Sequence, residues 1–141
     1  GARGYGVPAS VAAALRFPDR VSVVIAGDGD FMMNGQELAT AVQYEANLLV
    51  LVIDNGSFGT IRLHQEREYP ARLSATSLKN PDFAKLAEAY GGWSATVEST
   101  DEFAPALREA MQRKGLRLLH LKTDVEFLTA AGATVSGLRG K

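Results

Sequence analysis

The sequence predicts an α/β domain: an open parallel sheet in three layers, with helices on both faces. Short apolar runs, typical of strands, alternate along the chain with helical patterns. The first two runs are apolar almost throughout, as in strands covered on both faces. Helices between successive strands are typical of parallel crossovers. The expected strands cover residues 21–26, 48–54, 93–97 and 116–122.

The first two helices are predicted from their boundary residues. One covers residues 9–17; it is rich in alanine and follows Pro8. The other runs from Asn34 to about residue 46. Asn34 is its expected N-cap, and Glu37, three positions on, is the expected capping-box partner.

Two further helices follow the long middle segment. Asn80 and Pro81 form a cap followed by a proline at the first helical position, and Gly91 lies just past the expected end. The last helix starts at Ser99 or Thr100 and ends near residue 115.

The composition excludes several classes of protein. The chain has 141 residues, which fits one domain. Its 15 Lys and Arg against 16 Asp and Glu leave a net charge of −1, which argues against nucleic-acid partners and a basic membrane patch. It has no cysteine, which excludes disulfides and thiolate chemistry. The longest apolar run is far too short to span a membrane and no signal peptide is visible, so we expect a cytoplasmic protein.

Two segments lack a clear pattern. Residues 61–79 carry mixed charge without periodicity, and we expect a long loop that serves as a lid. Its charged run 66–68 is expected to be a solvated face. Residues 124–141 are expected to form a partly mobile tail after a domain at 1–123.

Two turns follow the first two strands and carry the candidate chemistry. Asp28 lies in the first turn and Asn55 in the second, 27 positions later, which is the length of one βαβ unit. Ligands of open parallel sheets bind at the carboxyl ends of the strands. Asp-Gly and Asn-Gly are also common structural turns, but a hairpin does not suit strands that lead into helices. Few protein oxygens together with phosphate oxygens are typical of a Mg²⁺ site.

The same residues carry a family resemblance. Gly27-Asp28-Gly29 followed by Asn55 resembles the GDG…N signature of enzymes that use thiamine diphosphate (ThDP). The segments GYGVPASVAAAL at 4–15, GDGDFMMNGQELATAVQY at 27–44 and DNGSFGTIR at 54–62 extend the match. It is closest to acetolactate synthase, benzoylformate decarboxylase and related enzymes of 2-oxo acids.

The resemblance covers roughly residues 1–122 and implies a role for each matching residue. Mg²⁺ would be held by Asp28, the Asn55 side chain and the Ser57 main-chain carbonyl, and it would bridge the diphosphate of ThDP. The other implied cofactor-binding residues are Gly1, Gly4, Tyr5, Gly27, Gly29, Asp30, Phe31, Asn55, Phe58 and Gly59. The cofactor would carry out decarboxylation of a 2-oxo acid or ligation of the resulting carbanion.

The resemblance also implies partners. In this family a glutamate on a separate pyrimidine-binding domain, normally from the neighbouring subunit, activates the cofactor. Nothing in this chain resembles that domain, and the chain starts at Gly1 rather than Met. We therefore expect an incomplete fold, a homodimer or homotetramer in the whole protein, a small 2-oxo acid as substrate, and no activity in the isolated chain.

Three departures from the family pattern leave alternatives open. Arg3 stands where a bulky apolar residue usually supports the cofactor, and Asp30 puts a carboxylate beside the expected phosphate. Both allow a second hypothesis, a cofactor-free domain with an assembly or regulatory role. His64 takes the place of a substrate-facing Trp; it is either a substrate contact or a solvated loop histidine. His120 lies in an apolar strand and is expected to be a core residue.

Overall fold

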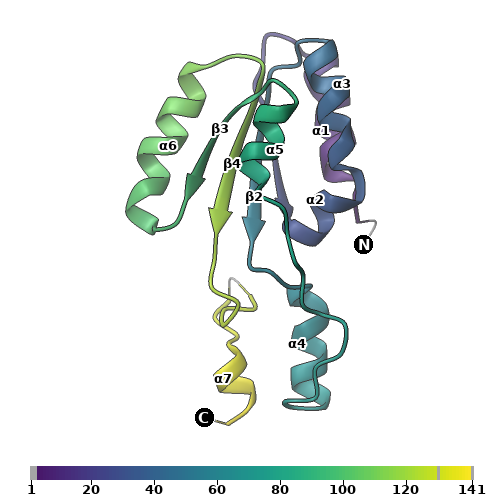
Figure 1. The fold of residues 1–141 in the computed structure, drawn as a ribbon, viewed down its shortest axis with the longest axis vertical. Coiled ribbons are helices and arrows are strands. Elements are labelled where there is room, and N and C mark those ends of the chain that lie inside the picture. Colours follow the sequence, from purple (N-terminus) through teal and green to yellow (C-terminus); the bar gives the residue numbers. More distant parts are fainter. Residues whose placement is uncertain (1–2, 130, 141) are drawn as a thin grey trace.

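The computed structural model describes residues 3–129 and 131–140 and contains one parallel sheet within them (Figure 1). Its strands are β1 (Ser22–Gly27), β2 (Leu48–Asp54), β3 (Trp93–Val97) and β4 (Leu116–Lys122), in the order β1-β2-β4-β3. All four expected strands are confirmed, to within one residue at each end. Over the same described residues, no helix is long and apolar enough to cross a membrane.

The helices flank the sheet or extend beyond its carboxyl edge, where α4 and α7 lie (Figure 1). They are α1 (Gly6–Arg16), α2 (Asp28–Asn34), α3 (Leu38–Gln43), α4 (Gly59–Glu68), α5 (Phe83–Ala89), α6 (Thr100–Gln112) and α7 (Val135–Leu138), with a 3₁₀ turn, η1 (Gly35–Glu37), between α2 and α3.

The strand side chains divide between two cores, as the alternation of a pleated sheet requires. One core gathers Val24, Val50 and Leu118 with side chains of α1, α2, α3 and α5. The other gathers Leu49 and Leu119 with α6. Helices therefore cover both faces, as predicted.

Helix α6 covers only part of its face of the sheet. Val23 and Ile25 of the edge strand β1 point to the side that α6 covers over β3 and β4, yet they are 50% and 69% exposed. The three-layer architecture is thus complete over β3 and β4 and open beside β1.

The second expected helix differs from the structure at its start. The chain turns into α2 directly at Asp28, and Asn34 ends that helix instead of capping the next one. The Asn34 amide donates to the Gly4 carbonyl at 2.8 Å, and Glu37 accepts from the Thr40 hydroxyl. The capping-box prediction was wrong because this long-range contact orients the Asn34 side chain, and its oxygen accepts from the Gln36 side chain instead of a main-chain N–H.

The start of the third helix was also predicted wrongly. Asp82 is the N-cap of α5, and its carboxylate accepts from the Lys85 main-chain N–H at 3.1 Å. Asn80 lies two residues earlier and bonds elsewhere. Gly91 follows the helix with φ +91°, as a helix C-terminus commonly requires.

A buried arginine closes the amino end of the sheet. Arg117 of β4 is fully buried and donates to the carbonyls of Ala110, Arg113 and Gly115 and to the side chain of Asn47. The first two carbonyls belong to the end of α6, whose dipole favours a cation. One side chain thus connects α6, β4 and the residue that precedes β2.

Replacing Arg117 with Met is expected to lower the free energy of unfolding. The variant leaves buried acceptors without a donor, and each costs roughly 1–3 kcal/mol. Urea denaturation measures the change. Arg108→Met on the exposed side of α6 is the matched control, and equal midpoints for the two variants would contradict this account.

Candidate functional site

The two candidate turns lie side by side at the carboxyl edge of the sheet. Gly27 at the end of β1 is paired with Ile53 of β2, so the residues after each strand face the same region. A cavity of about 230 Å³ lies between the turns. It is lined by Arg3, Gly27, Asp28, Gly29, Asp30, Ser57, Phe58, Gly59 and Thr60.

Asp28 is a buried carboxylate, and over residues 3–129 and 131–140 only uncharged groups donate to it. It is 3% exposed. One oxygen accepts from the Gly29 main-chain N–H at 2.8 Å and the other from the Asn80 amide at 2.7 Å. Burial raises the pKa of the Asp28 carboxyl above its ordinary value, against these hydrogen bonds. A nearby cation would favour its ionised form.

Asp54, at the end of β2, is held by charged groups. Burial opposes its ionisation, but the Lys122 ammonium, the His120 ring and the Asn80 amide, each at 2.7 Å, outweigh it and hold the pKa of Asp54 well below its usual range. Its charge is therefore balanced within the protein, whereas that of Asp28 is not.

The second turn offers uncharged oxygens. The Asn55 side chain accepts from the Ser57 N–H at 3.0 Å, and the Ser57 hydroxyl donates to the Thr76 carbonyl at 2.9 Å. Gly56 has φ +64°, a conformation that favours glycine. The Ser57 carbonyl accepts from the Gly59 N–H and keeps a second lone pair.

This donor set suits a hard divalent cation. Within residues 3–129 and 131–140, no three His, Asp or Glu side chains are grouped to hold a metal. One carboxylate with amide and carbonyl oxygens, beside a cavity lined by glycines, fits Mg²⁺ that takes its remaining ligands from phosphate and water.

Close packing explains two of the predicted glycines. A Cβ atom on Gly29 would lie 2.4 Å from the Phe58 ring, so this contact between the two turns requires glycine. Gly4 has φ +73°, and a Cβ there would lie 2.8 Å from the Asn34 amide. The Gly4 N–H donates to the Asp30 carboxylate at 2.7 Å, which ties the N-terminal turn to α2.

The other candidate site residues differ in burial and in position relative to the cavity. Phe31 is fully buried and packs edge-on against Phe83, with ring centroids 5.3 Å apart, so only its backbone is available to a ligand. Tyr5 is 70% exposed. His64 is exposed on α4 and does not line the cavity. Gly1 lies outside the described residues.

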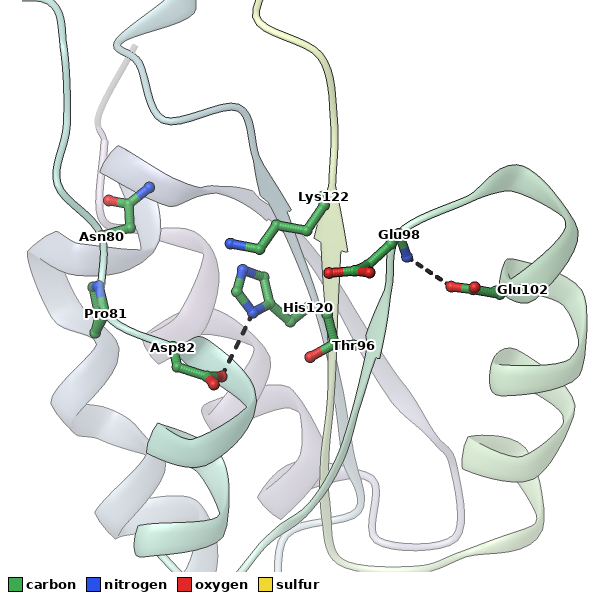
Figure 2. Close-up of a pocket in the computed structure, with 8 residues that line it drawn as sticks. All are labelled: Asn80, Pro81, Asp82, Thr96, Glu98, Glu102, His120 and Lys122. Atoms are coloured by element: carbon green, nitrogen blue, oxygen red, sulfur yellow. Dashed lines mark hydrogen bonds and ion pairs between the residues drawn. The ribbon is translucent and has the colours of Figure 1, made fainter.

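A second cavity, of about 570 Å³, lies beside the first. It is lined by Asn80, Pro81, Asp82, Thr96, Glu98, Glu102, His120 and Lys122, and Figure 2 shows His120 and Lys122 projecting from β4 toward the segment 80–82. His120 is buried, as predicted for a core histidine. Its Nδ1 atom lies 3.8 Å from the Asp82 carboxylate.

Sequence reasoning missed Asn80, which was interpreted as a helix cap, and Lys122, which was not singled out. Neither residue lies in a local sequence motif that would indicate its place at the site. The available signal was the register of the sheet, because Asp54 is the partner of Lys122 in the parallel ladder between β2 and β4.

The expected loop 61–79 is wrong in its first half, where residues 61–68 continue α4. Glu66, expected to be solvated, is fully buried and accepts two hydrogen bonds from Arg139 after α7. These contacts stabilise a helix that has no apolar stripe of its own. They also dock the tail, expected to be mobile, onto α4.

The contact between Glu66 and Arg139 is expected to depend on pH. The Arg139 guanidinium lowers the pKa of Glu66 from 4.5 to about 2. A carboxyl with a depressed pKa stabilises the folded state above its ordinary pKa, and this contribution is lost as the pH falls from 4.5 through about 2. The protection factors of the α7 amides, which compare the measured exchange rate with the intrinsic rate at each pH, are therefore expected to fall over this window.

Glu66→Gln is expected to lower the α7 protection factors at pH 7 and to reduce their acid dependence. The dependence that remains is expected from Glu126, which accepts from the hydroxyl and the N–H of Ser136 and whose pKa is lowered by these contacts. Glu68→Gln, two residues away and exposed, is the control and should behave as the unmodified chain. Identical exchange in both variants at pH 7 would contradict the role of the buried pair.

The fold and the site together define an α/β domain with a cavity between two glycine-containing turns at the carboxyl edge of its parallel sheet. The family model described as "Thiamine pyrophosphate enzyme, C-terminal TPP binding domain" matches residues 1–121. The chain belongs to this family, and its cofactor is thiamine diphosphate.

Curated relatives are acetolactate synthases. The chain is 38% identical over 125 residues to the acetolactate synthase isozyme 2 large subunit of Escherichia coli, covering 88% of this chain and 23% of that protein. It is 37% identical over 114 residues to the acetolactate synthase large subunit of Buchnera aphidicola, covering 80% and 20%. The chain thus spans about a fifth of the length of these relatives.

Solved structures share the fold. The thiamine diphosphate-dependent 4-hydroxybenzoylformate decarboxylase of Rhodococcus jostii superposes with a TM-score of 0.80 at 28% identity, covering 86% of this chain and 23% of that one. The benzoylformate decarboxylase of Polynucleobacter necessarius gives a TM-score of 0.80 at 29% identity, covering 87% and 24%.

Proposed function

We propose that this chain is the diphosphate- and Mg²⁺-binding part of a ThDP-dependent enzyme, similar to acetolactate synthase, that decarboxylates a 2-oxo acid or ligates the resulting carbanion to an acceptor. The proposal rests on the observation that two turns border the same cavity: Asp28 follows β1, and the Ser57–Thr60 turn follows β2.

In this proposal Asp28, the Asn55 side chain and the Ser57 carbonyl hold Mg²⁺. The backbone at Gly27, Gly29, Asp30 and Phe31, together with Phe58 and Gly59, binds the diphosphate, and the N-terminal turn with Gly1, Gly4 and Tyr5 approaches the aminopyrimidine. ThDP, when bound, supplies the carbon nucleophile and the electron sink for loss of CO₂. This chain's residues bind and orient it.

Arg3 and Asp30, the two charged residues that depart from the family pattern, are compatible with a bound diphosphate. The Asp30 carboxylate already accepts from Gly4, and Arg3 borders the same cavity. We propose that Arg3 offsets the charge of Asp30 there, since paired opposite charges lower the repulsion that a phosphate would meet.

We propose that further parts complete the catalytic unit. We propose a pyrimidine-binding domain from a neighbouring subunit, assembly as a homodimer or homotetramer, a small 2-oxo acid as substrate and a cytoplasmic location. Residues 1–123 would form the cofactor-binding unit. Segment 61–79 would cover the substrate, with His64 as a substrate contact.

Calorimetric titration of the 141-residue chain with ThDP in the presence of Mg²⁺ tests the assignment. A binding heat is expected for the unmodified chain, and Asp28→Ala is expected to abolish it because it removes the only carboxylate of the proposed ligand set. Asp101→Ala, on the exposed first turn of α6, should bind normally. No heat for the unmodified chain under any condition would instead favour the cofactor-free domain.

The isolated chain is expected to be inactive, because it lacks the glutamate that the family uses to activate the cofactor. Coupled assays for CO₂ release from pyruvate and from benzoylformate measure this. Sustained turnover by the purified chain alone would overturn the proposed division of the site between domains.

A further inference from the structure

One amide joins the two buried carboxylates at the carboxyl edge of the sheet. We propose that Asn80 is a positioning residue, which holds the Asp28 carboxylate in place for a divalent cation without neutralising it. This inference rests on the proposed function, since Asp28 is there the carboxylate ligand of Mg²⁺.

The geometry uses both hydrogens of the amide. The Nδ2 atom of Asn80 lies 2.7 Å from an oxygen of Asp28 and 2.7 Å from an oxygen of Asp54. A side-chain amide has two N–H donors on this nitrogen, so both are satisfied by carboxylates. Together with the Gly29 N–H, this contact fixes the orientation of the Asp28 carboxyl group.

The difference in charge between the two acids explains why an amide is suitable here. Lys122 and His120 bond to Asp54, and in Figure 2 both project from β4 toward the segment that carries Asn80. Asp28 receives only neutral donors. The neutral amide of Asn80 therefore connects Asp28 to the Asp54 cluster and restricts its movement. The negative charge of Asp28 remains available to the cation.

The position of Asn80 is itself well determined. On its N-terminal side, the Leu78 N–H donates to the Gly56 carbonyl and the Phe58 N–H donates to the Thr76 carbonyl, both at 2.8 Å. On its C-terminal side, Asp82 caps α5. The segment is thus attached to the turn that holds the other two proposed ligands, and outer-shell partners of this kind orient metal ligands.

The test measures ThDP affinity of the 141-residue chain by calorimetry as a function of Mg²⁺ concentration. Asn80→Ala is expected to raise the Mg²⁺ concentration needed for half-maximal ThDP binding about 10- to 100-fold, the range typical of lost outer-shell partners. Circular dichroism at the titration temperature confirms that each variant is folded.

Two further variants distinguish a positioning role of Asn80 from an effect on folding stability alone. Asn47→Ala removes another buried amide contact, to Arg117 at the opposite end of the sheet; it should lower the melting temperature and leave the Mg²⁺ requirement unchanged. Asn80→Lys places a cation beside both carboxylates. It should melt no lower than Asn80→Ala without Mg²⁺, yet show the larger loss of Mg²⁺-dependent ThDP binding.

The outcomes distinguish the inference from the proposed function. If the unmodified chain binds ThDP with Mg²⁺, Asp28→Ala does not, and Asn80→Ala has an unchanged Mg²⁺ requirement, the positioning role is wrong and the proposed function stands. If Asn80→Lys binds as well as the unmodified chain, the charge argument fails. If the unmodified chain does not bind, both are overturned.

Discussion

The carboxyl edge of this sheet depends on one buried negative charge, that of Asp54. A buried carboxylate is stable only when it is paired and hydrogen-bonded. Here the donors come from β4, from the loop before α5 and from the backbone of the following turn. Segments that are distant in the sequence are therefore held at one point, and the side chains of Asn80, His120 and Lys122 that meet there line the larger of the two cavities.

This arrangement assigns different roles to two acids that lie close together. Asp54 is bonded to the Lys122 ammonium and organises the protein. Among the described residues Asp28 accepts only from neutral donors, and in the proposed function it is left to attract a cation. Since the pKa values move in opposite directions, down for Asp54 and up for Asp28, the environment rather than the residue type decides the role of each carboxylate.

The sequence was sufficient for the sheet and for the place of the two candidate turns. Continuous apolar runs predicted the strands, and one βαβ interval placed Asp28 and Asn55 on neighbouring strand ends. The partners of these residues were not predictable in the same way. Asn80 reaches Asp28 across 52 positions and Arg139 reaches Glu66 across 73. Two local signals led to wrong interpretations. Asn80 before a proline was interpreted as a helix cap and Glu66 in a charged run as solvated, but both side chains bond to residues far away in the sequence.

The two ends of the sheet differ in how they respond to protons. At the amino end, Arg117 keeps its charge over any accessible pH and bonds to neutral acceptors, none of which titrates. At the carboxyl end, the contacts depend on ionised carboxylates. Acid would consequently loosen the carboxyl edge of the sheet first, while Arg117 still joins α6 to the start of β4.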